Sequence, residues 1–212
     1  MCPYRYNDAN VKKMTMPPLQ SYCQTILCLD FDGVLHRACD AIHIASGPTS
    51  GPLLAVQMKA QGRLVWLDHL VEILADRPDV AILVHSTWRR KFDQATLAHL
   101  LGELGDRVLQ PPGYFVDLSA PAPEFIRQSL EWVNESRREA HVAELRLDEI
   151  VVIDDRPEFF ASDEGVAARL LLTDPNQGLS VRETRGRLAA MLDAARSDRA
   201  APEMGAGPSS KF

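Results

Sequence analysis

The chain has 212 residues, of which 46% are hydrophobic, and a formal net charge of −6 at pH 7. This size and composition suit one globular α/β domain with short terminal extensions. The negative charge excludes a global basic field that would attract nucleic acid, although a local basic groove is compatible with it. No apolar run approaches the roughly 20 residues that a membrane span needs, so we expect no membrane partner.

Polar segments flank the region of regular patterns. Residues 1–22 are polar and without periodicity, which predicts a flexible N-terminal arm. Residues 197–212 are rich in Ala, Pro, Gly and Ser, which predicts a disordered tail and leaves a domain at 23–196. The N-terminus lacks the pattern of a secretory signal, and none of the four cysteines forms a Cys-x-x-Cys pair. We therefore expect reduced thiols and a cytoplasmic protein.

Short apolar runs alternate with amphipathic patterns through the domain. The expected elements, in chain order, are a strand at 25–29, a helix at 64–76, a strand at 80–85, a helix at 92–102, a short strand at 108–109, a helix at 123–138, a strand at 150–153, a strand at 168–172 and a helix at 182–195. The alternation predicts a three-layer, Rossmann-like parallel sheet with right-handed crossovers. Residues 37–61 are rich in Gly, Pro and Ser, which predicts a flap, and so only a minimal cap.

Three of the expected strands end in polar side chains. The first is followed by Asp-Phe-Asp-Gly at 30–33, the second by Ser-Thr at 86–87 and the third by Asp-Asp at 154–155. Taken alone, each of these polar groups is also typical of a turn or a helix cap. The carboxyl ends of parallel strands lie at one edge of the sheet, so the three groups are expected to converge there. Their combination predicts a functional site.

These residue types suit phosphate chemistry. Hydrolysis of a phosphate monoester is among the slowest uncatalysed reactions, and a carboxylate nucleophile divides it into two easier steps. An anionic nucleophile attacking an anionic phosphate needs positive charge nearby. Mg²⁺, held by a few carboxylates, supplies such charge. A second acid is needed to protonate the leaving oxygen and then to activate water.

The Asp-x-Asp-Gly motif after a hydrophobic strand resembles the haloacid-dehalogenase-like (HAD) phosphohydrolases. The resemblance implies that Asp30 is the nucleophile and that Asp32 is the general acid/base. Both acids would contribute to the Mg²⁺ site, Asp32 through its backbone carbonyl. Gly33 would let the backbone turn sharply beneath the site.

The other two strand ends take roles by the same resemblance. Ser86 would bind the transferring phosphoryl group, with Thr87 as the nearby alternative. Asp155 would be the metal ligand of the last motif, with Asp154 second. Asp155 is preferred to Asp154 as the ligand because residues 151–157 are similar to the corresponding segment of carboxy-terminal-domain phosphatases.

The family also places a lysine or arginine beside the nucleophile, and two residues compete for this role. Lys91 follows the hydroxyl motif in Trp-Arg-Arg-Lys at 88–91, and Arg127 lies in the expected helix before the last acid pair. Lysine is the commoner choice, which favours Lys91. A run of basic residues is also commonly only a solvated surface.

Two further segments resemble one branch of the superfamily. Ser-Thr-Trp-Arg at 86–89 and Thr-Asp-Pro-Asn-Gln-Gly-Leu at 173–179 are similar to the HAD domain of Swiss Army Knife RNA repair proteins. The resemblance implies a Mg²⁺-dependent phosphatase whose substrate is a phosphorylated small molecule or a nucleic-acid end. The sequence also leaves open a third hypothesis about function, in which the HAD fold is catalytically idle and acts as a binding or regulatory module.

Overall fold

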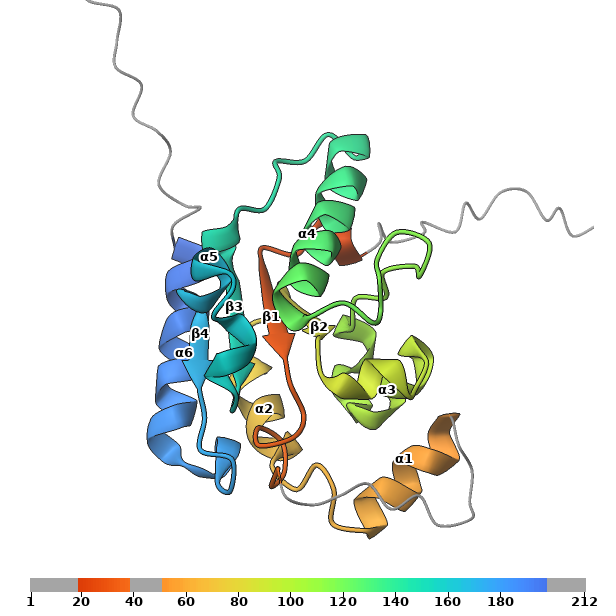
Figure 1. Cartoon of the computed structure of the whole chain (residues 1–212), viewed down its shortest axis with the longest axis vertical. Coiled ribbons are helices and arrows are strands. Elements are labelled where there is room, and N and C mark those ends of the chain that lie inside the picture. The colour runs from red at the N-terminus through yellow and green to blue at the C-terminus, as the bar shows by residue number, and fades with distance from the viewer. Residues whose placement is uncertain (1–18, 39–50, 198–212) are drawn as a thin grey trace, which may run out of the picture.

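Four parallel strands form one sheet in a computed structural model that describes residues 19–38 and 51–197. Their bounds are Thr25–Leu29 (β1), Val80–Val84 (β2), Ile150–Asp154 (β3) and Leu170–Leu172 (β4). The strand order is β2-β1-β3-β4, and every neighbouring pair is parallel. The C-terminal ends of the strands therefore lie at one edge of the sheet (Figure 1).

Helices cover both faces of the sheet. Within the described ranges they are Gly51–Ala60 (α1), Leu67–Leu74 (α2), Gln94–Leu100 (α3), Ala122–Glu139 (α4), Glu164–Ala167 (α5) and Arg182–Ser197 (α6). Side chains of a strand alternate between the two faces. Leu27 and Leu29 pack with residues of α1, α2, α3 and α6, whereas Ile26 and Cys28 pack with residues of α4 and α5. The predicted three-layer α/β fold is confirmed.

Local chemistry explains where two helices begin later than predicted. Leu64 has a positive φ of 56°, a conformation that interrupts an α-helix of L-residues, and α2 begins only at Leu67. Asp93 accepts a hydrogen bond from the backbone N–H of Thr96 (2.7 Å), so α3 begins after this cap rather than at Phe92.

Three other expectations are corrected. Residues 51–60 of the expected flap form helix α1, whose buried Leu54 and Met58 join the core. The short strand expected at 108–109 is a single bridge between Val108 and Ile82. The last strand begins at Leu170, because a turn of helix, α5, occupies the residues before it.

The terminal extensions fall largely outside the described residues. These are 1–18 of the expected arm, 39–50 of the expected flap and 198–212 of the expected tail. Leu19–Ser21, at the end of the arm, forms a 3₁₀ turn that contacts α4. Among the described residues, no helix has both the length and the apolar character needed to cross a membrane.

Candidate active site

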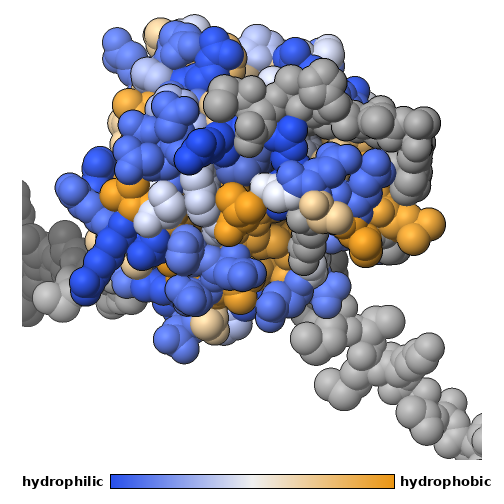
Figure 2. Space-filling model, turned by 90° about the horizontal axis from the view of Figure 1, so that it is seen from below, coloured by the Kyte–Doolittle hydropathy of each residue, from blue (hydrophilic) through white to orange (hydrophobic). Residues whose placement is uncertain are grey.

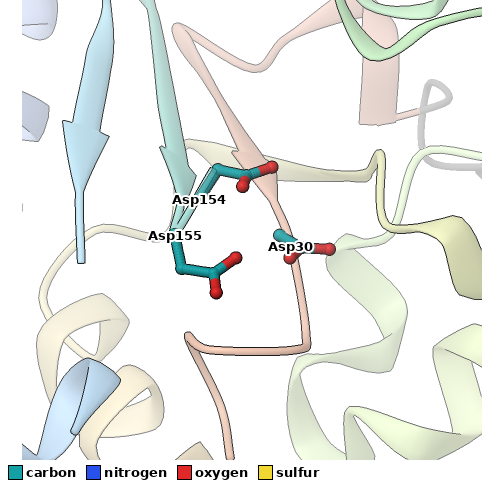
Figure 3. A group of neighbouring side chains, drawn as sticks. All are labelled: Asp30, Asp154 and Asp155. Atoms are coloured by element: carbon teal, nitrogen blue, oxygen red, sulfur yellow. The ribbon is translucent and has the colours of Figure 1, made fainter. Parts of the chain in front are cut away.

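Three carboxylates converge at the C-terminal edge of the sheet. Asp30 follows β1, Asp154 ends β3 and Asp155 follows it, and all three side chains point toward the same space (Figure 3). One carboxylate oxygen from each lies within 4.8 Å of the others. The predicted convergence of the two acid pairs is therefore present in the structure.

The pairing of β1 with β3 produces this arrangement. Leu29 stands opposite Ile153 in the parallel ladder, and the backbone N–H of Asp30 donates to the carbonyl of Ile153 (3.1 Å). The acids that follow each strand are therefore neighbours although they are far apart in the sequence. Both strands are continuous apolar runs, and their side chains are buried in the core on the two faces of the sheet.

Burial makes these acids unusually basic. The pKa of Asp30 is raised well above its usual value, chiefly because the side chain is buried and also because Asp154 is negative. Burial likewise raises the pKa of Asp154 to about 7. His85 lies 3.8 Å from Asp154, but burial lowers its pKa to about 3, so it is neutral and does not balance the charge.

This donor set fits a hard divalent cation. Mg²⁺ prefers carboxylate oxygens and usually keeps several water ligands, so two or three aspartates suffice. Within the described residues, no lysine or arginine forms an ion pair with Asp30, Asp154 or Asp155. A cation at their centre would offset both the burial and the mutual repulsion that raise their pKa values.

Gly33 forms the floor beneath Asp155. Its φ of 70° is left-handed, and a Cβ atom built on it would lie 2.4 Å from Cγ of Asp155. Only glycine fits this close approach without displacing the acid. The hydroxyl of Thr173 donates to the carbonyl of Gly33 (2.9 Å) and fixes the loop from the other side.

Asp32 lies two residues beyond Asp30 and is held by two donors. Trp88 Nε1 donates to Asp32 Oδ2 (2.9 Å), and His36 Nε2 lies 3.0 Å from Asp32 Oδ1. Trp88 and His36 are buried, whereas the Asp32 side chain is 30% exposed. Asp32 therefore faces the solvent side of the site in a fixed orientation.

Ser86 and Thr87 lie where β2 gives way to a 3₁₀ turn, Thr87–Arg90. The Ser86 hydroxyl donates to Asp30, a contact that partly offsets the raised pKa of that acid, and it accepts from the N–H of Trp88 (3.4 Å). Ser86 is thus both a cap of the turn and a neighbour of the nucleophile candidate. Thr87 is exposed at the edge of the site.

The two predicted cations occupy different surroundings. Lys91 is exposed and lines the same cavity as Asp30. Arg127 is not among the residues that line this cavity; it pairs with Asp163 through both of its carboxylate oxygens, and its side chain is 51% exposed. Of the two, Lys91 and not Arg127 therefore shares the cavity with the acids.

Arg89 is a third cation, and it belongs to the basic run for which the sequence also suggested a solvated surface. It is buried, and its guanidinium donates to the carbonyls of His85, Ser86 and Ala120 and lies 4.5 Å from the Phe125 ring centroid. Burial lowers its pKa to about 10, so it remains charged at neutral pH. Its Nε has no partner among the described groups.

A cavity of about 640 Å³ opens above these groups. It is lined by Asp30, Asp32, Ala38, His85, Thr87, Trp88, Arg89, Arg90, Lys91, Pro121, Ala122, Asp154, Asp155, Arg156 and Phe159. Figure 2 views the molecule from the side of the strand ends and shows a mainly hydrophilic surface with hydrophobic areas near its middle. The lining of the cavity therefore combines acidic, basic and apolar side chains.

Comparison with known proteins agrees with the motifs. Residues 26–184 match the family described as the HAD domain in Swiss Army Knife RNA repair proteins. The chain belongs to this family. The match includes residues of all four strands and every acid of the site, and it ends in the first turn of α6. Neither the curated proteins nor the solved structures compared with the chain gave a significant match.

Sequence reasoning placed most of the residues that this HAD domain brings together, but it missed three contributions. No chemical role was predicted for Trp88 or His36, and Arg89 was expected only as part of a basic run. The signal for Arg89 and Trp88 was their position directly after Ser-Thr at a strand end. A 3₁₀ turn there directs both side chains inward, which the expectation of a solvated helical turn did not anticipate.

Proposed function

We propose that this protein is a Mg²⁺-dependent phosphohydrolase that acts on a phosphomonoester through an aspartyl-phosphate on Asp30. The observation that carries the proposal is the convergence of Asp30, Asp154 and Asp155 beside a second acid, Asp32, over one cavity. Asp30, Asp154 and Asp155 would hold the metal. Bound there, Mg²⁺ would stabilise negative charge that develops on the phosphoryl oxygens.

Asp30 and Asp32 would carry out the two steps of the reaction together. Asp30 Oδ attacks phosphorus, the bond from phosphorus to the leaving oxygen breaks, and Asp32 gives its proton to that oxygen. In the second step Asp32 takes a proton from water, whose oxygen attacks phosphorus. Inorganic phosphate leaves, and the carboxylate of Asp30 is restored.

Three further groups support this chemistry. The Ser86 hydroxyl, which contacts Asp30, would donate to a phosphoryl oxygen of the substrate. Arg89 and Lys91 supply positive charge in the lining of the same cavity. Buried Arg89 is fixed by backbone carbonyls, and such pre-organised charge is effective because little reorganisation is needed during reaction.

The test is turnover of para-nitrophenyl phosphate by the purified protein with Mg²⁺. Asp30→Asn should abolish turnover, whereas Asp68→Asn, at an exposed acid of α2, should leave it unchanged. An aluminium or beryllium fluoride adduct on Asp30 would test the nucleophile separately. Lack of Asp30-dependent turnover across a broad phosphoester panel would refute the enzyme and favour an idle HAD fold that binds a partner.

A nucleic-acid end is the second candidate substrate. Arg90, Lys91 and Arg156 add positive charge to the cavity lining, and Phe159 adds an aromatic ring that is 38% exposed, with the guanidinium carbon of Arg156 4.1 Å from its centroid. Basic side chains and an exposed ring are the features that bind a phosphodiester chain and a base. The RNA repair context of the family supports the same substrate.

Oligonucleotides with a 3′- or 5′-phosphate would decide between the candidates. A nucleic-acid substrate predicts a kcat/KM for one of these ends well above that for small phosphoesters, with a strong decrease at high salt. Equal kcat/KM values for both classes would favour a small-molecule phosphatase. Phe159→Ala should weaken only the oligonucleotide reaction.

A further inference from the structure

Asp32 accepts a hydrogen bond at each of its two oxygens. Trp88 Nε1 is 2.9 Å from Oδ2, and His36 Nε2 is 3.0 Å from Oδ1. A carboxylate has about four lone-pair sites, so each oxygen keeps acceptor capacity for a proton. The two bonds fix the plane of the carboxyl group without consuming that capacity.

The two donors are themselves held firmly. Trp88 is 1% exposed, and its ring stacks edge-on against Phe31 with 5.3 Å between centroids and lies 5.7 Å from Phe92. His36 is fully buried, and its centroid lies 5.5 Å from that of Trp88. Neither side chain can turn away without opening the core, so the donors keep one geometry.

The tautomer of His36 follows from its surroundings. Its Nδ1 has no hydrogen-bond partner among the described residues. A buried N–H without a partner is costly, so the proton belongs on Nε2, where Asp32 accepts it. His36 is therefore a donor to Asp32 in the neutral form, and the bond needs no charge on the ring.

We propose that Trp88 and His36 are positioning residues that aim Asp32 at the leaving oxygen and then at the attacking water. The inference rests on the proposed function and deepens it. A proton must be delivered within hydrogen-bond reach and along one direction, and a freely rotating carboxyl group would meet this condition only part of the time. A role in packing alone would not need a donor at either position.

Leaving-group dependence separates positioning from packing. Transfer of the phosphoryl group from para-nitrophenyl phosphate releases a stable phenolate that needs no proton, whereas glycerol phosphate releases an alkoxide that does. The constant kcat/KM reports the first phosphoryl transfer alone. If the Asp32 carboxyl group loses its fixed orientation, kcat/KM for glycerol phosphate should therefore fall, and kcat/KM for para-nitrophenyl phosphate should stay nearly unchanged.

Trp88→Phe removes the N–H and keeps an aromatic ring. We expect kcat/KM for glycerol phosphate to fall about 10- to 100-fold, and that for para-nitrophenyl phosphate less than about threefold. Asp32→Asn should show the same selectivity with larger losses. Trp132→Phe, at a half-buried tryptophan of α4 away from the cavity, is the matched control and should change neither constant.

His36 provides a second test that does not disturb Trp88. The side-chain amide of glutamine can place a donor where Nε2 lies, so His36→Gln should retain most of the activity on glycerol phosphate. His36→Leu fills the space without a donor and should lose about as much as Trp88→Phe. If Trp88→Phe does not fold, as circular dichroism would show, this pair decides the question.

Several results would overturn the inference. Equal losses with both substrates in Trp88→Phe or His36→Leu, or unchanged constants in a folded variant, would show that the donors do not aim Asp32. Equal behaviour of His36→Gln and His36→Leu would do the same. An inactive wild-type protein would refute the proposed function, whereas an active one with equal losses refutes only the positioning role.

Discussion

Replacing Gly33 with alanine tests the link between backbone conformation and the metal ligands. The new methyl group would lie 2.4 Å from both Cγ and Oδ2 of Asp155 and 2.6 Å from its Cβ. Contacts this short are not tolerated, so Asp155 must rotate or the loop must move. Either shift breaks the arrangement in which three carboxylates face one point.

The expected magnitude has two parts. The left-handed φ of 70° costs an L-residue about 1–2 kcal/mol of unfolding free energy. Displacement of Asp155 adds a loss in Mg²⁺ affinity of at least about 10-fold, since even changes around metal ligands cost this much. Stability and metal binding should thus both fall.

Gly62→Ala is a matched control. Gly62 has nearly the same φ, 71°, but a Cβ there would meet no atom within 4 Å. It should show the same loss of about 1–2 kcal/mol with unchanged Mg²⁺ affinity. Urea unfolding of the metal-free proteins and calorimetric titration with Mg²⁺ measure the two quantities. Wild-type Mg²⁺ affinity in Gly33→Ala would refute Asp155 as a ligand, and equal losses in both variants would refute the clash.

Two further outcomes follow from the charges of the site. Folding raises the pKa of Asp30 and that of Asp154, the latter to about 7, whereas it lowers the pKa of His85 to about 3. The two acids outweigh the one histidine, so the metal-free folded protein binds more protons than the unfolded chain, and its unfolding free energy should fall as pH rises from about 4 to about 7. Urea titrations in a chelator would show this slope, flatter in Asp154→Asn, and a rising stability would contradict it. Lys91→Ala should lower kcat/KM at least about 10-fold, whereas Arg127→Ala should leave it unchanged and cost less than about 1 kcal/mol. Reversal of these two effects would assign the cation to Arg127.

The sequence was sufficient to predict the sheet and the convergence of the acids at its edge. Strand β1 has the predicted bounds, because a short apolar run buried on both faces has few alternatives. Helix α4 differs from the expected range by one residue at each end. The acids could be grouped because parallel strands share one carboxyl edge, a rule that needs no knowledge of the loops.

The features of the fold and site that the sequence did not predict depend on tertiary contacts, which local sequence patterns do not encode. Helix α1 lies in a segment rich in Gly, Pro and Ser, and Leu54 and Met58 are helical there because the core accepts them. Arg89 has the composition of a surface residue, and its burial depends on carbonyls that lie partly in a distant loop, such as that of Ala120. The link from Trp88 to Asp32 spans 56 residues and leaves no trace in either segment alone.

The hydrogen bond from Thr173 to Gly33 joins residues 140 positions apart and has a consequence for synthesis. A ribosome completes Asp30 and Asp32 early, but the loop that carries them gains this support only after β4 has emerged. Until β3 has emerged, a nascent chain also exposes Asp30 without its neighbours Asp154 and Asp155. The complete acid cluster should therefore form late in synthesis, after β3 and β4 have joined the sheet.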